Sequence, residues 1–212
     1  MKRSNDKAVF DGRMRDKMSE KTEKKRDWII RCAHSVFALK GYRCVTMKDI
    51  VEASSISRGG LYLYFSSVEE VFLAVLDKEE KRTDEDFANE QLQTASNVEM
   101  LLWFLKAQKK EILQKKGSLL TAKYEYAFAC RENKKSSPLQ KEMKKASLVL
   151  QKLLERGIES GEFVCFDSVR EAENMMLAIE GMKVLACTTG IGEKKVDSEF
   201  LYMMQRIVPE EI

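Results

Sequence analysis

Residues 46–65 read TMKDIVEASSISRGGLYLYF, and this stretch decides the fold of the chain. Thr46 is a good N-cap for a short helix, and Asp49 can complete a capping box with it. Ser57 is a good N-cap for a second helix, which begins with glycines and continues with tyrosines. Because one short helix and a turn fit between the two caps, the pattern is typical of a helix-turn-helix DNA reader. Any other helical hairpin is the alternative at this point.

The helices around this turn have predictable apolar sides. The first of the two reader helices should bury Met47, Ile50, Val51 and Ala53, which recur at helical spacing. Ser54 and Ser55 end that pattern. A preceding helix is predicted over residues 24–40 and should end at Gly41. Its inward stripe is Ile29, Ala33, Val36 and Phe37.

This part of the chain resembles the N-terminal domain of the TetR family of transcriptional regulators. The resemblance covers residues 26 to about 76 and rests on Phe37, Gly41, Tyr42, Thr46, Asp49, Ile50, Ser57, Gly59, Leu61, Tyr62, Tyr64 and Phe65. The chain departs from the family at two places. Ser54-Ser55 replaces the usual Ala-Gly of the turn, so the resemblance implies a positive φ at Ser55. Val68 stands where relatives often carry a phosphate-binding lysine. Ser66 or Ser67 is available for that contact instead.

The composition independently favours an all-α chain. Only two prolines and ten glycines occur in 212 residues, and 44% of the residues are hydrophobic. The resemblance then implies three parts. Residues 1–23 form a charged N-terminal arm, expected to be mobile. Residues 24–76 form a three-helix helix-turn-helix DNA-binding domain, and residues 77–212 form a helical domain for effector binding and dimerisation.

Charge is distributed unevenly, although the net charge is only +3. Residues 1–66 hold 15 Lys and Arg against 8 Asp and Glu, and the rest of the chain holds 22 against 26. A basic head on an acidic body fits a nucleic-acid-binding N-terminal domain. No segment approaches the roughly 20 apolar residues of a membrane span, and the N-terminus has no apolar signal core, so we expect a cytoplasmic protein and no membrane partner.

Enzymatic chemistry is hard to build from these residues. His34 is the single histidine, and it has no acid or nucleophile at a useful helical spacing. Five cysteines without CxxC spacing suggest a reducing compartment and no zinc site, with a redox switch as the less favoured alternative. We therefore predict no enzyme activity, no metal and no cofactor.

In contrast, the sequence contains many side chains that are suited to contact DNA. Arg58 is the best base-reading residue because its guanidinium fork fits guanine. Gly60 stands where relatives often carry a base-contacting side chain, so specificity should depend on Arg58, Met47 and Lys48. Tyr62 could be a buried core ring, but the resemblance places its hydroxyl on the DNA backbone. The predicted DNA-binding residues are Lys25, Arg26, Thr46, Met47, Lys48, Ser57, Arg58, Gly59, Gly60, Tyr62, Tyr64 and Ser67.

The second half should form longer helices over about 98–114, 118–132, 138–160, 168–189 and 196–208. Its aromatic and Met residues could be ordinary core, and the resemblance to ligand-sensing repressors adds the possibility of an effector pocket. The pocket candidates are Trp103, Phe104, Tyr124, Glu125, Tyr126, Phe128, Met175 and Met176. Glu125 is either a polar anchor for a cationic ligand or a solvent-facing side chain.

In the TetR family the last two helices of each subunit form a four-helix dimer interface. The corresponding candidates here are Ile179, Met182, Leu201, Met204 and Ile207, with ordinary core packing as the alternative. Together these features predict a homodimeric repressor that binds a near-palindromic double-stranded operator and is released by a small apolar or amphipathic effector. The alternatives are regulation by a protein partner and, less favoured, a helical enzyme.

Overall fold

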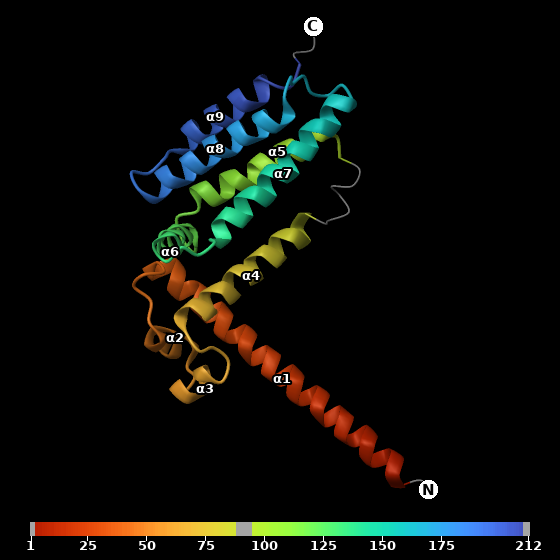
Figure 1. The fold of residues 1–212 in the computed structure, drawn as a ribbon, viewed down its shortest axis with the longest axis vertical. Helices are drawn as coiled ribbons and strands as arrows, with labels where there is room; N and C mark the ends of the chain where they lie inside the picture. Colours follow the sequence, from red (N-terminus) through yellow and green to blue (C-terminus); the bar gives the residue numbers. More distant parts are fainter. Residues whose placement is uncertain (1–2, 88–94, 210–212) are drawn as a thin grey trace. The chain divides into compact units, whose positions relative to one another are not determined.

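The computed structural model describes residues 3–87 and 95–209, with side chains described for 20–82 and 95–209. The described residues are helical and contain no strand, which confirms the predicted all-α class. Their helices are α1 (Arg3–Lys40), α2 (Met47–Ser54), α3 (Arg58–Tyr62), α4 (Val68–Phe87), α5 (Asn97–Leu113), α6 (Leu120–Glu132), α7 (Pro138–Glu159), α8 (Ser168–Cys187) and α9 (Glu193–Gln205) (Figure 1). Among them, none combines the length and apolarity that a membrane span requires.

The chain divides into two compact units, Met1–Lys81 and Arg82–Ile212, called unit 1 and unit 2 below. The division lies inside α4, as does the boundary that we placed after residue 76. Our expected helix start at Lys24 is wrong, because α1 begins at Arg3 and includes most of the segment that we took for an arm. Residues 1–2 lie outside the described part of the chain.

Unit 1 is built around the C-terminal half of α1. Gly41, with φ 74°, ends this helix and donates its N–H to the Phe37 carbonyl at 2.9 Å. The Phe72 ring of α4 lies 4.7 Å from the Phe37 ring and 5.0 Å from the Tyr42 ring, measured between centroids. The core of unit 1 also includes Ile29, Ile30, Ala33, Ile50, Leu61, Phe65, Val71 and Val75.

The apolar side of α2 differs from the prediction at its end. Ile50 is buried, Met47 and Val51 are half-buried, and Ala53 is exposed. Ser54 is buried at the end of α2 instead. Its burial is tolerated because its hydroxyl donates a hydrogen bond to the Ile50 carbonyl at 2.6 Å, which replaces a hydrogen bond to water. The expectation that Ala53 would be buried is therefore wrong.

Unit 2 is a bundle in which α5, α7, α8 and α9 share one apolar core, and α6 contacts α7 and α8 (Figure 1). Each helix predicted for this half is present, with its ends displaced by a few residues. The buried core includes Leu101, Phe104, Leu150, Leu154, Met175, Ile179, Val196 and Phe200.

A charged network crosses this bundle. Lys183 of α8 is 5% exposed and bonds to Glu111 of α5 at 2.8 Å and to Glu180 at 3.2 Å. Glu180 also accepts a hydrogen bond from the Tyr124 hydroxyl of α6 at 2.8 Å. Burial lowers the pKa of Lys183, but the charges of Glu111 and Glu180 outweigh burial and raise it. Lys183 therefore stays charged at neutral pH. Lys123 of α6 adds a second cation to Glu111, at 3.4 Å.

Removing the buried ammonium should destabilise unit 2. Lys183→Met keeps the shape of the side chain but leaves Glu111 and Glu180 short of a cation, which typically costs about 3–5 kcal/mol. Lys195→Met removes the exposed α9 pair with Glu199 and should change stability by less than about 0.5 kcal/mol. Urea unfolding of both variants at one protein concentration measures the difference. Equal losses in the two variants would contradict the importance of the buried network.

Candidate nucleic-acid interface

The two reader helices are capped as their sequence predicts. The Thr46 side chain accepts from the Asp49 N–H at 3.3 Å, and the Asp49 carboxylate accepts from the Thr46 N–H at 2.7 Å, completing the capping box. Ser57 caps α3 by accepting from the Gly60 N–H at 3.1 Å. Between them, Ser55 has φ 54°, as we expected for the turn.

The caps are tied to α1 by charge. Lys40, in the last turn of α1, bonds to the Asp49 carboxylate. Hydrogen bonds from Lys40 and Thr46 hold the pKa of Asp49 well below its ordinary value, so this carboxylate is charged at neutral pH. Trp28 of α1 donates its indole N–H to the Ser54 carbonyl at 3.0 Å. Both ends of α2 are thus fixed against α1.

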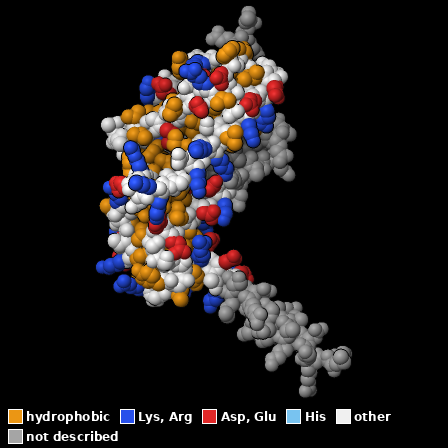
Figure 2. Space-filling view, in the orientation of Figure 1, with side chains coloured by type: hydrophobic (Ala, Val, Ile, Leu, Met, Phe, Trp, Pro, Cys, Tyr) orange, Lys and Arg blue, Asp and Glu red, His pale blue; other side chains and the backbone are white. Residues whose placement is uncertain are grey.

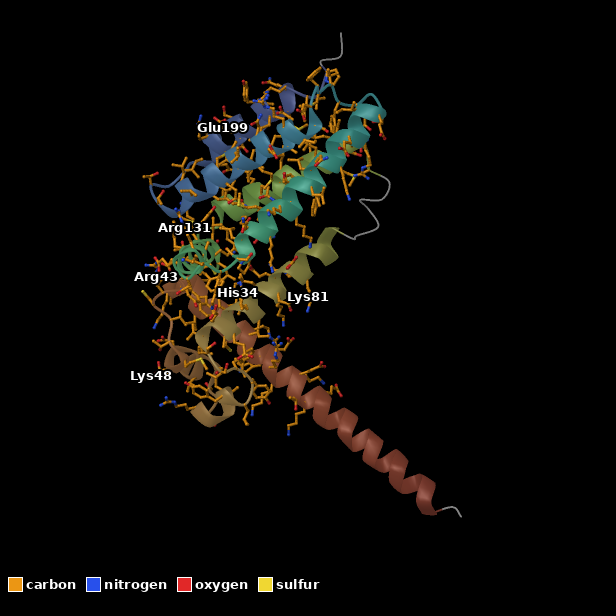
Figure 3. All side chains as sticks on the ribbon, viewed as in Figure 1. His34, Arg43, Lys48, Lys81, Arg131 and Glu199 are labelled. Carbon is orange, nitrogen blue, oxygen red and sulfur yellow. The ribbon has the colours of Figure 1, made fainter. Side chains whose placement is uncertain are left out.

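The structure leaves every predicted DNA-binding side chain at least partly accessible. Lys48 extends from α2 into solvent and forms an exposed ion pair with Glu52 at 3.7 Å (Figure 3). The exposed members of the set are Lys25, Arg26, Thr46, Lys48, Ser57, Arg58, Gly59 and Tyr62. The half-buried members are Met47, Gly60, Tyr64 and Ser67.

Tyr62 is a surface residue. Its side chain is 44% exposed, so the buried-ring alternative does not apply. The guanidinium carbon of Arg58 lies over the Tyr62 ring, 5.8 Å from its centroid. Leu61 between the two glycines and Tyr62 is fully buried and anchors α3 to unit 1. The short α3 therefore presents Arg58 and Tyr62 together on its outer face.

Ser66 and Ser67 make different hydrogen bonds at the start of α4. Ser66 gives both its N–H and its hydroxyl to the Glu70 carboxylate, at 2.6 and 2.8 Å. The Ser67 hydroxyl accepts from the Glu70 N–H at 3.1 Å and keeps its own hydrogen for another acceptor. Of the two serines, Ser67 is therefore the better phosphate donor.

Two contacts between α1 and α4 were missed by the sequence reasoning. His34 lies 3.1 Å from the Glu79 carboxylate, and Lys78 lies 2.7 Å from the Asp27 carboxylate. We had looked for a partner of His34 within its own helix, but the partner comes from α4. No pattern in the sequence pairs residues of two different helices, so only the fold identifies them.

The predicted effector residues occupy different environments in unit 2. Tyr126 and the core residues Phe104, Met175 and Met176 are buried, whereas Trp103, Tyr124 and Glu125 are half-buried. Phe128 is 58% exposed, which separates it from the buried members. The Tyr124 hydroxyl donates to the Glu180 carboxylate, and burial raises the pKa of this hydroxyl, with the charge of Glu180 adding to the effect. The hydroxyl therefore remains a hydrogen-bond donor at neutral pH.

The predicted dimer residues differ in their exposure. Ile179 and Met182 of α8, and Ile207 after α9, are buried within the core of unit 2. Met204 is half-buried, and Leu201 is exposed. The apolar side chains that α8 and α9 expose are Val169, Leu177, Val184, Leu185, Leu201 and Tyr202. Apolar and charged side chains are interspersed on the visible surface of unit 2 (Figure 2).

Comparison with known proteins assigns both halves of the chain to one family. Residues 29–75 match the description "Bacterial regulatory proteins, tetR family", and residues 100–197 match "Tetracyclin repressor-like, C-terminal domain". The uncharacterized HTH-type transcriptional regulator YfiR of Bacillus subtilis is 32% identical over 147 residues, which cover 68% of this chain and 70% of YfiR. The regulator QacR of Staphylococcus aureus is 35% identical over 74 residues, which cover 35% of this chain and 39% of QacR.

The fold is shared with solved regulators. A transcriptional regulator from Saccharomonospora viridis, solved in complex with choline, aligns with a TM-score of 0.73 over 89% of this chain and 100% of that protein. At 18% identity this likeness concerns the fold alone. Membership of the family is shown instead by the two family matches and by the 32% identity to YfiR. The chain therefore belongs to the TetR family and is a DNA-binding transcriptional regulator, not an enzyme.

Proposed function

We propose that this chain forms a homodimeric repressor that binds a near-palindromic operator and leaves it when a small amphipathic effector occupies unit 2. Regulators of this family bind DNA operators and act as dimers. The observation that carries the proposal is the outer face of α3, where Arg58 and Tyr62 are presented from a helix fixed by its cap and by buried Leu61. Since the proposed target is the DNA of the cell, the proposed place of action is the cytoplasm.

The proposed DNA contacts divide into two kinds. Arg58 reads a guanine through its fork, with Met47 and Lys48 of α2 beside it as further base contacts. The hydroxyls of Ser57, Tyr62, Tyr64 and Ser67 and the charges of Lys25 and Arg26 meet phosphates and position the helix pair without reading sequence. The Thr46 hydroxyl donates to the Asp49 carboxylate at 2.7 Å in the free protein and would exchange that bond for one to a phosphate. In a dimer the two copies of α3 should enter major grooves about one helical turn apart, roughly 34–36 Å, which is why the operator is expected to be near-palindromic.

Gly59 and Gly60 have different reasons to be glycine. A Cβ at Gly59 would have no atom within 4 Å, so the free protein tolerates a side chain there. A Cβ at Gly60 would lie 2.8 Å from Ile56 Cγ2 and 3.0 Å from Ser57 Oγ, the capping atom. We infer that Gly60 is needed by the fold and Gly59 by the close approach of DNA. On this proposal, a side chain at position 60 would crowd the Ser57 cap of this chain.

The proposed dimer face is the exposed apolar stripe of α8 and α9. On α8, Leu177, Gly181 and Val184 follow one another at helical spacing on the outer side, and Leu201 and Tyr202 are exposed on α9. Gly181 has open space at its Cβ position, which permits a second helix to approach closely. A second copy presenting the same stripe would cover apolar area that is otherwise exposed to water.

The proposed effector site lies at the side of unit 2 where α6 meets α8. There Tyr124 and Glu180 link the two helices, and Lys183 and Glu111 continue the polar network into the bundle. An amphipathic molecule bound there would exchange hydrogen bonds with this network through its polar part and bury its apolar part against unit 2. Its effect can reach unit 1 through α4, which spans the division between the units and contacts α1 through Lys78 and Glu79.

A matched pair of variants tests the roles of the two glycines. Gly59→Ala should leave thermal stability unchanged or slightly raised, because alanine is the better helix former, yet weaken operator binding. Gly60→Ala should lower stability by about 1–3 kcal/mol through crowding of the cap. Thermal unfolding and fluorescence anisotropy with operator DNA measure the two effects. Full operator affinity in Gly59→Ala would show that DNA does not approach this backbone.

Charge placed on the apolar stripe should prevent dimer formation. Leu177→Asp and Leu201→Asp are expected to give folded monomers, because each would place an unpaired carboxylate in the interface. Leu148→Asp alters an exposed leucine of α7 and serves as the control that stays dimeric. Light scattering at micromolar concentration gives the masses. A monomeric wild type, or dimers of both stripe variants, would refute the proposed face.

Effector release is tested by a thermal-shift screen of amphipathic compounds that includes choline and other organic cations. Each stabilising compound is then added to an operator titration. An effector that favours the DNA-incompetent state should lower operator affinity about 5–150-fold, and operator DNA should weaken its binding by the same factor. Tyr124→Phe should change the effector affinity while leaving effector-free operator binding intact. Compounds that stabilise the protein without changing operator affinity would rule out this form of regulation.

A further inference from the structure

Arg58 and Tyr62 form a pair on the surface of α3. They are four residues apart, so they lie one above the other on the same side of the helix. The guanidinium carbon is 5.8 Å from the ring centroid, within the distance at which an arginine is attracted to an aromatic face. Both side chains are exposed in the free protein. The contact therefore exists before any DNA is bound.

The rest of α3 offers Arg58 no other side-chain support within the helix. Gly59 and Gly60 have no side chains, and Leu61 is fully buried. A free arginine on such a bare helix would sample many rotamers, and each rotamer lost on binding weakens the complex. A bidentate contact to guanine requires the planar fork to lie in the plane of the base. Holding the fork in advance reduces the cost of that alignment.

We propose that the Tyr62 ring is a positioning residue for Arg58 and thereby sets part of the operator specificity. The inference rests on the proposed function, in which Arg58 reads a base. On this inference, the hydroxyl and the ring of Tyr62 have separate effects on DNA binding. The hydroxyl contributes to affinity for any duplex through a phosphate, and the ring contributes to discrimination between duplexes through Arg58.

The test uses the full-length protein and a duplex selected from random sequence by the wild type. Fluorescence anisotropy at one salt concentration gives the dissociation constant for this duplex. The same measurement is made for duplexes in which each base pair of one half-site is exchanged in turn. The ratio of the two constants is the discrimination at that position. Circular dichroism checks that each variant is folded. We expect folded variants because both side chains are exposed.

Arg58→Ala should abolish discrimination at one or two positions of the half-site. Tyr62→Leu should lower discrimination at the same positions about two- to fivefold, the range expected from loss of an exposed cation–π contact. In the Arg58→Ala background, Tyr62→Leu should have no further effect on discrimination. Tyr62→Phe keeps the ring and should weaken binding to all duplexes alike, with unchanged discrimination.

Unchanged discrimination in Tyr62→Leu, beside a loss in Arg58→Ala, would overturn this inference and leave the proposed function standing. Equal losses of discrimination in Tyr62→Phe and Tyr62→Leu would assign the effect to the hydroxyl and overturn it as well. If Arg58→Ala discriminates as the wild type does, Arg58 reads no base and the pairing has no such role. A wild type that selects no duplex would instead overturn the proposed function itself.

Discussion

The placement of α3 depends on the turn between Ser54 and Ser57, in which Ser55 adopts a left-handed backbone. This conformation is unfavourable for a residue with a Cβ and persists when its surroundings hold it. Three contacts do so here. The Ser54 hydroxyl bonds to Ile50, the Ser54 carbonyl accepts from Trp28, and the Ser57 hydroxyl caps α3. Because these groups are mutually satisfied, α2 and α3 keep one angle, and the residues proposed to meet DNA keep one arrangement.

Unit 2 is organised by a different principle. Its helices share an apolar core, but α5, α6 and α8 are also joined by charged groups with little access to water. Burying ions is costly unless every partner is in place, so such a network favours one arrangement of helices over near alternatives. A site at this network is suited to regulation, because a ligand that exchanges even one of these bonds alters the balance between arrangements of the bundle.

Helix caps and turns could be predicted from residues that are close in the sequence, whereas contacts between different helices could not. The caps at Thr46 and Ser57 follow from residue types within a few positions of each other, whereas the positive φ of Ser55 was implied by the family resemblance. The start of α1 was missed because its polar N-terminal residues lack apolar periodicity, although exposed pairs such as Glu20 and Lys24 can support a helix there. For Ile179 and Met182, periodicity identified an apolar face of α8 without indicating whether its own subunit or a second copy covers that face.

The contacts between α1 and α4 bear on how salt acts on this protein. The Asp27–Lys78 ion pair, which joins the two helices, is well exposed. Dissolved ions screen such pairs as they screen the attraction between a protein and phosphates. Added salt thus loosens the attachment of α4 to α1 while it weakens contact with DNA. The steepness with which operator affinity falls with ionic strength will therefore combine an internal, conformational part with the displacement of counterions, and it will overstate the number of phosphates that the protein contacts.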